Sequence, residues 1–175
     1  VEAALKQVTA MESNLYEFSV EQLRRAYRDH YFAPAGDMDA QDNPLSWHIL
    51  PLAGSGNFIH GLPEFGTLLV QARQGRAVSR GQGASLNGRR IRTTSVSHLD
   101  QAMLSVALIN QLPTGASSLA WGELLASLGQ SAGGIRDSGL PLLDLARVGA
   151  GRLDGAMVRV GHPSENLFAG LMAGE

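Results

Sequence analysis

Few side chains in this 175-residue sequence have the type and spacing needed for known catalytic or metal-binding chemistry. Cysteine is absent, which excludes disulfides, thiolate chemistry and cysteine-based zinc sites. Ser55 and Ser138 have no neighbouring His or Asp pattern that indicates a nucleophile triad. The segment Gly81-Gln82-Gly83 lacks the rest of a dinucleotide fingerprint. The histidines show no paired ligand spacing and are expected at the surface or at caps: His30, His48, His60, His98 and His162.

Apolar spacing and turn residues predict a mixture of helices and strands. Helices are predicted from Tyr16 to near Tyr31 and over residues 121–128, 142–150 and 167–173. Strands are predicted over residues 47–52, 65–73, 102–109 and 155–160. Residues 33–44 hold three Asp, two Pro and Gly36, which is typical of a loop. These elements predict an α/β-type layered fold.

Composition and charge indicate an ordinary globular chain. Hydrophobic residues make up 44% and charged residues 17%, and the formal net charge is -2. This balance gives no electrostatic reason to expect nucleic acid or an anionic membrane as a partner. No apolar run approaches the roughly 20 residues that span a bilayer, and residues 1–6 have no basic region or cleavage site. We therefore expect a cytoplasmic protein with one domain over residues 1–175.

Residues 47–63, WHILPLAGSGNFIHGLP, resemble the signature W-x-I-D-P-(I/L)-D-G-T-x-N-F-x-H-x-x-P of the inositol monophosphatase family. Other segments match the family in the same order: VTAME at 8–12, RGQGASLNG at 80–88, and SG, LDLA and GRLDG between 138 and 155. These segments span most of the chain, which is identified as a member of this family. The resemblance implies a layered αβαβα sandwich, here lacking outer elements and incomplete at both ends relative to the family.

The family hydrolyses phosphate monoesters with magnesium ions, which are held by carboxylates from three distant segments. The resemblance places these ligand positions at Ala35, Leu50, Ala53 and Asn166. Magnesium requires hard oxygen ligands, but Leu and Ala supply none and Asn supplies only a neutral oxygen. Without metal, monoester hydrolysis keeps most of its uncatalysed barrier, so a metal site is not expected. The alternative is that the ligands are relocated to the nearby acidic loop: Asp37, Asp39 and Asp42.

Other positions of the family site are retained in altered form. Glu12 and Ser55 stand where family members orient the attacking water, and without metal we interpret them as cap and surface residues. In the family, Gly54, Ser55 and Gly56 lead into the first turn of a helix, whose free N–H groups can bind an anion. Arg159 replaces a substrate-contacting glutamate, and its guanidinium favours phosphate or carboxylate. These four residues form the predicted phosphate site, with an empty vestigial cleft as the alternative.

The resemblance thus implies a catalytically inactive inositol monophosphatase-like protein that binds a small phosphorylated or anionic ligand. No cofactor is expected. Magnesium enters only under the alternative of a phosphate monoesterase that acts on inositol, sugar or nucleotide phosphates through relocated ligands. A further alternative is a structural partner of an active paralogue. A homodimer is also implied by the resemblance.

Overall fold

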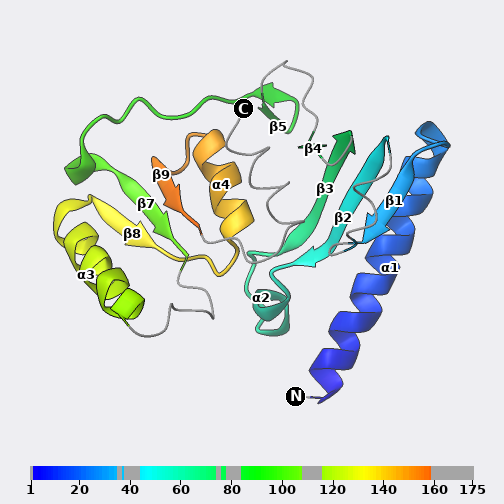
Figure 1. Ribbon diagram of the computed structural model, residues 1–175, viewed down its shortest axis with the longest axis horizontal. Coiled ribbons are helices and arrows are strands. Elements are labelled where there is room, and N and C mark those ends of the chain that lie inside the picture. Colours follow the sequence, from blue (N-terminus) through cyan, green and yellow to red (C-terminus); the bar gives the residue numbers. More distant parts are fainter. Residues whose placement is uncertain are drawn as a thin grey trace. The chain divides into compact units, whose positions relative to one another are not determined.

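The computed structural model describes residues 2–34, 37, 44–73, 76–77, 84–107 and 116–158. These residues fall into two compact units, one containing described residues up to 77 and one containing those from 84 onward (Figure 1). No described helix is both long and apolar enough to cross a membrane. The single domain predicted over residues 1–175 stays a prediction.

The first unit is built on a four-stranded sheet. Its elements, in chain order, are α1 (Glu2–Ala26), β1 (Tyr31–Pro34), β2 (Ser46–Ala53), α2 (Ser55–Ile59), β3 (Gly66–Arg73) and β4 (Arg76–Ala77). The strand order is β1-β2-β3-β4, in which β1 and β2 are parallel and the other neighbours are antiparallel. The long helix α1 packs against β2 (Figure 1). The strands predicted over residues 47–52 and 65–73 are confirmed as β2 and β3.

The two faces of this sheet have different coverings. Phe32 and Trp47 are partners across β1 and β2 and share one face. The Arg24 guanidinium of α1 lies 5.4 Å from the centroid of the Phe32 ring, so α1 covers this face, and the Tyr16 hydroxyl donates a hydrogen bond to the Phe32 carbonyl oxygen at 3.0 Å. Side chains of the opposite face alternate with these along the strands. Five of them are closed to solvent, with exposed fractions of 0% or 1%: Ala33, Ser46, His48, Val70 and Ala72.

Helix α1 ends earlier than the apolar spacing predicts. The helix ends at Ala26 rather than near Tyr31, and Tyr31 instead begins β1. The apolar pattern continues past the helix because the Tyr27 ring packs 5.1 Å from the Trp47 ring of β2. Strand β1 was not predicted, and its last two residues lie in the segment predicted as a loop. Because β1 pairs with β2, a short apolar run in that segment becomes part of the sheet.

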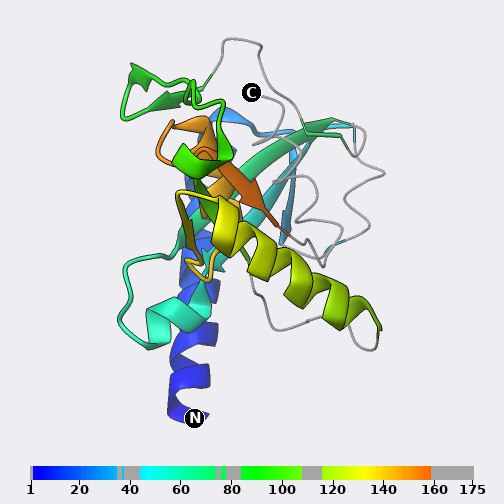
Figure 2. The ribbon, with the colours of Figure 1, turned by 90° about the vertical axis from the view of Figure 1, so that its left-hand side faces the viewer.

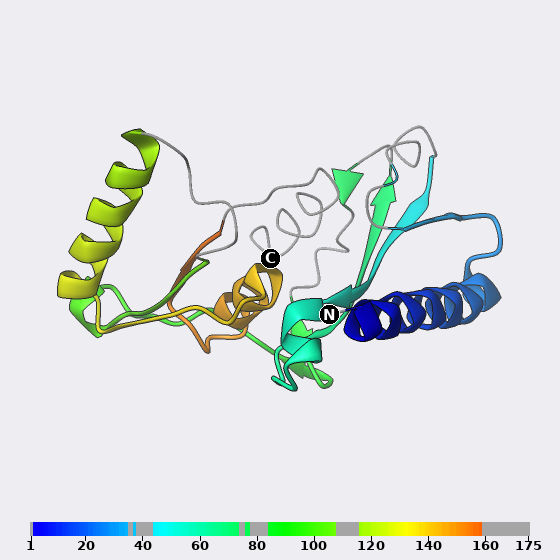
Figure 3. The same cartoon turned by 90° about the horizontal axis from the view of Figure 1, so that it is seen from below.

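The second unit contains a parallel three-stranded sheet and two longer helices. Its elements are β5 (Ser85–Leu86), β6 (Arg89–Arg90), the 3₁₀ turn η2 (Leu99–Gln101), β7 (Met103–Val106), α3 (Ala116–Ser131), β8 (Gly134–Arg136), α4 (Pro141–Gly149) and β9 (Gly155–Met157). The strand order β8-β7-β9 places β7 at the centre. Helix α3 contacts β8, whereas α4 contacts β7 and β9 (Figures 2 and 3).

The sequence predicts most elements of this unit. The strands over 102–109 and 155–160 and the helices over 121–128 and 142–150 are confirmed in their described parts, whereas β8 was missed. The helix predicted over 167–173 lies outside the described residues. The segment GASLNG ends in a hairpin turn in which Asn87 has φ 52° and Gly88 has φ 76°. Two consecutive positive φ angles define a type I′ turn, which favours Asn-Gly.

Candidate functional site

The candidate site begins where β2 ends with an irregular register against β3. Leu50 pairs with Leu68, but Ala53 pairs with Gly66, so one extra residue of β2 lies between the two pairings. Such a bulge bends the strand and changes the direction of its side chains. The Thr67 hydroxyl donates to the Pro51 carbonyl oxygen at 2.8 Å and holds the bulge against β3. Leu50 and Ala53 thus lie on either side of a fixed irregularity.

A glycine joins this strand to the short helix α2. Gly54 is the N-cap of α2 and has φ 78° and ψ 36°, a left-handed conformation that favours glycine. Ser55 and Gly56 are the first residues of α2, so the helix predicted to follow the turn is present. No side chain of the described residues caps this end of α2. The first N–H groups of an α-helix have no partner within the helix, which leaves them available to an acceptor from outside.

Two side chains of α2, Asn57 and Phe58, contact the segment that follows this helix. The Asn57 side-chain amide donates to the Glu64 carbonyl oxygen at 2.8 Å. The Phe58 ring meets the Phe65 ring edge-on, with 5.2 Å between the centroids. The backbone N–H of Leu62 also donates to the Asn57 carbonyl oxygen at 2.9 Å. Asn57 and Phe58 therefore position the turn without any need for a ligand.

The described part of this site does not fit magnesium. Leu50 is half-buried and Ala53 is only 4% exposed, and neither side chain has an oxygen atom. Magnesium binds through carboxylates and retains several waters, which an alkyl pair at the end of a buried strand cannot supply. Among the described residues no group of three or more His, Asp or Glu side chains could hold a metal ion. The predicted site residues Ala35, Arg159 and Asn166 lie outside the described residues.

The structure places Glu12 and Ser55 at different points of two helices. Glu12 lies in the middle of α1 and is half-buried, so it is at neither end of the helix. Ser55 lies at the start of α2, but the cap position itself is occupied by Gly54. The helices that carry Glu12 and Ser55, α1 and α2, are in contact. Among the described residues, neither Glu12 nor Ser55 caps a helix through its side chain.

His48 is buried, in contrast to the surface or capping position predicted from the sequence. It is 1% exposed, and its Nε2 atom lies 3.2 Å from the Ser46 hydroxyl. Its Nδ1 atom has no hydrogen-bond partner among the described residues. Burial lowers the pKa of His48, while the charge of Asp37 acts in the opposite direction. The only available signal was the alternation of His48 with Trp47 and Ile49 along an apolar strand.

Asp37 is the one residue of the acidic loop that the structure describes. The Tyr31 hydroxyl donates to its Oδ2 atom at 2.7 Å. Burial raises the pKa of Tyr16, and the charge of Asp37 raises it further, against a smaller lowering by Arg24. Asp37 therefore lies within electrostatic reach of both α1 and β2. Asp39 and Asp42 lie outside the described residues.

The second unit has a buried polar cluster centred on Asp144 of α4, which the sequence does not single out. Asp144 is 0% exposed, and its Oδ2 atom accepts from the Ser105 hydroxyl at 2.6 Å and the Ser138 hydroxyl at 2.7 Å. Its Oδ1 atom accepts from Arg147 at 2.9 Å. Burial alone would raise the pKa of Asp144, but these hydrogen bonds and the Arg147 charge hold it below its usual range. The cluster joins β7, the segment after β8 and α4.

Comparison with known proteins identifies the class to which this layered α/β fold and its motif belong. No family model matches the chain. The inositol monophosphatase structure from Anabaena (Nostoc) sp. PCC 7120 superimposes with a TM-score of 0.77 at 26% identity, covering 97% of this chain and 74% of that one. The chain therefore has the inositol monophosphatase fold, as the sequence predicts.

Two proteins of this class are similar to the chain in sequence. Nus factor SuhB of Pseudomonas aeruginosa is 32% identical over 169 residues, which cover 84% of this chain. Inositol-1-monophosphatase of Rhizobium meliloti is 34% identical over 134 residues, which cover 68% of this chain and 50% of that protein. The chain belongs to the inositol monophosphatase family. It spans 61% to 66% of the length of the SuhB relatives that it matches.

Proposed function

We propose that this chain is an inositol monophosphatase-like protein without metal-dependent phosphatase activity. One observation carries the proposal. Leu50 and Ala53, at the two positions where the family resemblance expects metal-binding aspartates, flank the bulge at the end of β2. Their alkyl side chains supply neither charge nor oxygen to a magnesium ion. Without the ion, no group at these positions activates water or neutralises the charge on a transferring phosphoryl group.

Calorimetry and a phosphatase assay test this proposal together. Magnesium titrated into the protein is expected to give no binding heat. Incubation with inositol, sugar and nucleotide monophosphates in the presence of magnesium is expected to release no phosphate. Magnesium binding at about millimolar affinity or tighter, accompanied by turnover, would contradict the proposal. That result would favour the alternative of relocated ligands, for which Asp37 is the described candidate.

Anion binding at the start of α2 is the activity that we propose remains. Support comes from the left-handed Gly54 and from the absence of a cap by any described side chain, which leave the N–H groups of Ser55 and Gly56 to an external acceptor. Because α2 has only five residues, these N–H groups rather than a long helix dipole would make the contact. Arg159 would supply the positive charge.

Thermal unfolding with and without inorganic phosphate tests this part of the proposal. Phosphate is expected to raise the melting temperature, and Arg159→Glu is expected to abolish the increase. Arg152→Glu, at an exposed position of the second unit, is a control with the same charge change. If phosphate leaves the unmodified protein unchanged, the turn does not bind anions.

The same proposal covers location and partners. We propose a cytoplasmic homodimer whose ligand is a small phosphorylated or anionic molecule. The alternative role of a structural partner is tested by mixing the protein with an active relative and measuring whether the two co-elute. The absence of a nucleic-acid partner, which the charge balance predicts, stays a prediction.

A further inference from the structure

Three side chains from separate parts of the first unit meet where α1 turns into β1. His30, in the turn between these two elements, is half-buried. The Trp47 indole N–H of β2 donates to the Nδ1 atom of His30 at 3.1 Å. The side-chain nitrogen of Gln71 of β3 lies 3.4 Å from the same Nδ1 atom. Trp47 and Gln71 are partners across β2 and β3, so both reach His30 from one face of the sheet.

The chemistry of the indole determines the protonation state of His30 in this arrangement. The indole nitrogen of tryptophan can donate a hydrogen bond but cannot accept one. The Nδ1 atom that accepts from Trp47 therefore carries no proton, and the ring is the neutral tautomer with its proton on Nε2. Protonation of His30 adds a hydrogen to Nδ1, which would then face the Trp47 N–H. Two donors cannot share this contact, so the bond to Trp47 is lost when His30 is charged.

Gln71 can provide a partner for the charged ring at the same place. A glutamine amide has a carbonyl oxygen beside its NH₂ group, and a half-turn about the last side-chain bond exchanges the two. With its oxygen turned toward His30, Gln71 accepts a hydrogen bond from the protonated Nδ1 atom. The centroid of the Tyr27 ring lies 5.0 Å from that of His30, within the distance at which an aromatic ring attracts a cation. The imidazolium can thus stay in the turn with a new partner.

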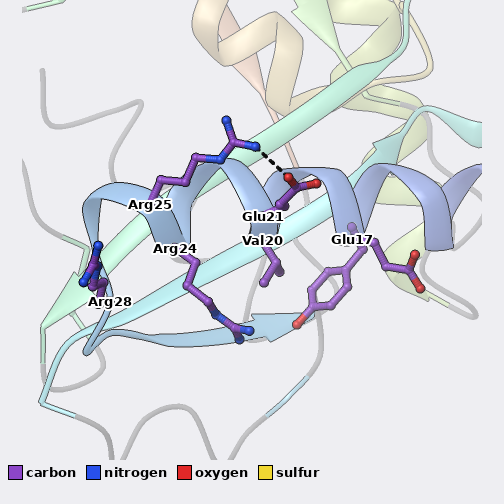
Figure 4. A pocket seen from close by; sticks show the side chains of 7 residues that line it. Glu17, Val20, Glu21, Arg24, Arg25 and Arg28 are labelled. Atoms are coloured by element: carbon purple, nitrogen blue, oxygen red, sulfur yellow. Dashed lines mark hydrogen bonds and ion pairs between the residues drawn. The ribbon is translucent and has the colours of Figure 1, made fainter.

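Charges of both signs surround His30, but it is paired with none of them. Three arginines at the end of α1, Arg24, Arg25 and Arg28, line a surface hollow (Figure 4), and Arg25 is neutralised by Glu21 at 2.6 Å. The other charged or titratable side chains described on the neighbouring elements are Asp29 of the turn, Tyr31 of β1, Asp37 beyond β1, Arg73 of β3, and His48 on the opposite face of β2. No ion pair joins His30 to a described residue. The hydrogen-bond partner therefore distinguishes its two states.

We propose that His30 is a proton-driven latch between the end of α1 and the sheet. Neutral His30 accepts from Trp47 and ties the turn after α1 to β2, the strand that ends at the bulge. Protonated His30 releases the Trp47 indole and donates to Gln71 of β3 instead. Histidine is the side chain whose charge ordinarily changes between pH 5 and 8, so the attachment of this turn to β2 depends on pH in that range. The latch contains no residue of the proposed anion site and is independent of it.

The indole N–H signal of Trp47 in a ¹H–¹⁵N spectrum tests the release. The chain has two tryptophans, so Trp121→Phe leaves Trp47 as the single indole. From pH 8 to pH 5 its indole proton is expected to shift upfield in one reversible step, because its hydrogen bond is lost. Adding His30→Gln, which cannot become charged, is expected to abolish the step. His98→Gln, at an exposed histidine, and His48→Gln, next to Trp47 in sequence, are controls expected to retain it.

Variants of Gln71 test the exchange of partners. Gln71→Glu supplies a carboxylate that favours the charged ring, so the step is expected at higher pH. Gln71→Met keeps the length of the side chain without the acceptor, so the step is expected at lower pH. A step at the same pH in both variants as in the parent would overturn the exchange.

The ring nitrogens of His30 provide a check on the unmodified chain that needs no substitution. At pH 8 the ¹⁵N signals are expected to show an unprotonated Nδ1 and a protonated Nε2. The opposite tautomer at pH 8 would overturn the proposal. So would a Trp47 indole signal that does not move between pH 8 and pH 5, or one that moves equally with and without His30→Gln.

Discussion

Among the described residues, two ionisable side chains are less than 2% exposed: His48 and Asp144. Folding favours the neutral form of His48 but the charged form of Asp144. Asp144 is surrounded by three hydrogen-bond donors that favour its charged form. Among the described residues the Ser46 hydroxyl is the hydrogen-bonding neighbour of the His48 ring, and the burial of His48 favours its neutral form. A buried charge is therefore retained only where donors replace the lost water.

The stability of the protein is expected to depend on the protonation of His48. Because the pKa of His48 is lowered in the folded state, its stabilising effect is fully present above the unfolded value of about 6.5. That effect is lost as the pH falls from this value through the folded-state pKa, at about 1.4 kcal/mol for each unit of separation. His48→Gln should remove this acid-dependent loss, whereas exposed His98→Gln should leave it unchanged. Urea unfolding at pH 8, 6 and 5 gives the free energy of unfolding at each pH. If this free energy falls equally with pH in the unmodified protein and in both variants, the prediction is refuted.

Helix α4 shows how the end of an element depends on one residue. Gly151 follows α4 with φ 64°, and a Cβ atom there would lie 2.7 Å from the Arg92 carbonyl oxygen. Both the backbone angle and the close approach therefore require glycine. Gly149, two positions earlier, has no atom of a described residue within 4 Å of an added Cβ atom and no positive φ angle. The two glycines are close in sequence but have opposite tolerance to a side chain.

Alanine substitutions at these glycines should separate the two cases. Gly151→Ala is expected to lower the free energy of unfolding by about 2 kcal/mol through backbone strain and displacement of the Arg92 segment. Gly149→Ala is the matched control and is expected to have no effect or to stabilise by up to about 1 kcal/mol. Urea unfolding of both variants at neutral pH measures the two changes. A loss of similar size at both positions would mean that the left-handed angle and the close approach at Gly151 do not determine the outcome.

Across the whole chain, the positions at which the family resemblance expects metal ligands lie in segments that are far apart in sequence. Two of the four positions, Leu50 and Ala53, belong to β2 and the bulge, whereas Ala35 and Asn166 belong to other segments. A magnesium site needs several oxygen ligands at once. Introducing carboxylates in one segment alone should therefore leave the affinity for magnesium negligible.

Restoring all four positions is expected to restore metal binding where partial restoration does not. The variant A35E/L50D/A53D/N166D should bind magnesium at about millimolar affinity or tighter, and L50D/A53D alone should not. A quadruple variant with Gln and Asn in place of Glu and Asp controls for changes in shape. Calorimetry at neutral pH distinguishes the three proteins. Binding by L50D/A53D alone would show that the other segments already supply ligands.

Much of the fold can be predicted because it depends on local apolar patterns. Strands β2 and β3 and helices α3 and α4 each contain enough periodic residues to be recognised singly. Strand β1 has four residues and β8 has three, so their sequences hold too little pattern. They are strands because β2 and β7 lie beside them and supply hydrogen bonds.

The candidate site likewise has some features that the sequence predicts and others that it does not. The residue types at Leu50 and Ala53 already indicate an absence of oxygen ligands, and Gly54 indicates a turn, because both properties belong to single side chains. The bulge beside Leu50, the burial of His48 and the cluster around Asp144 were decided only by the tertiary structure. Each of these depends on a partner far away in sequence, such as Leu68 of β3 or Ser105 of β7. A residue type shows which bonds are chemically available, but packing brings the two partners together.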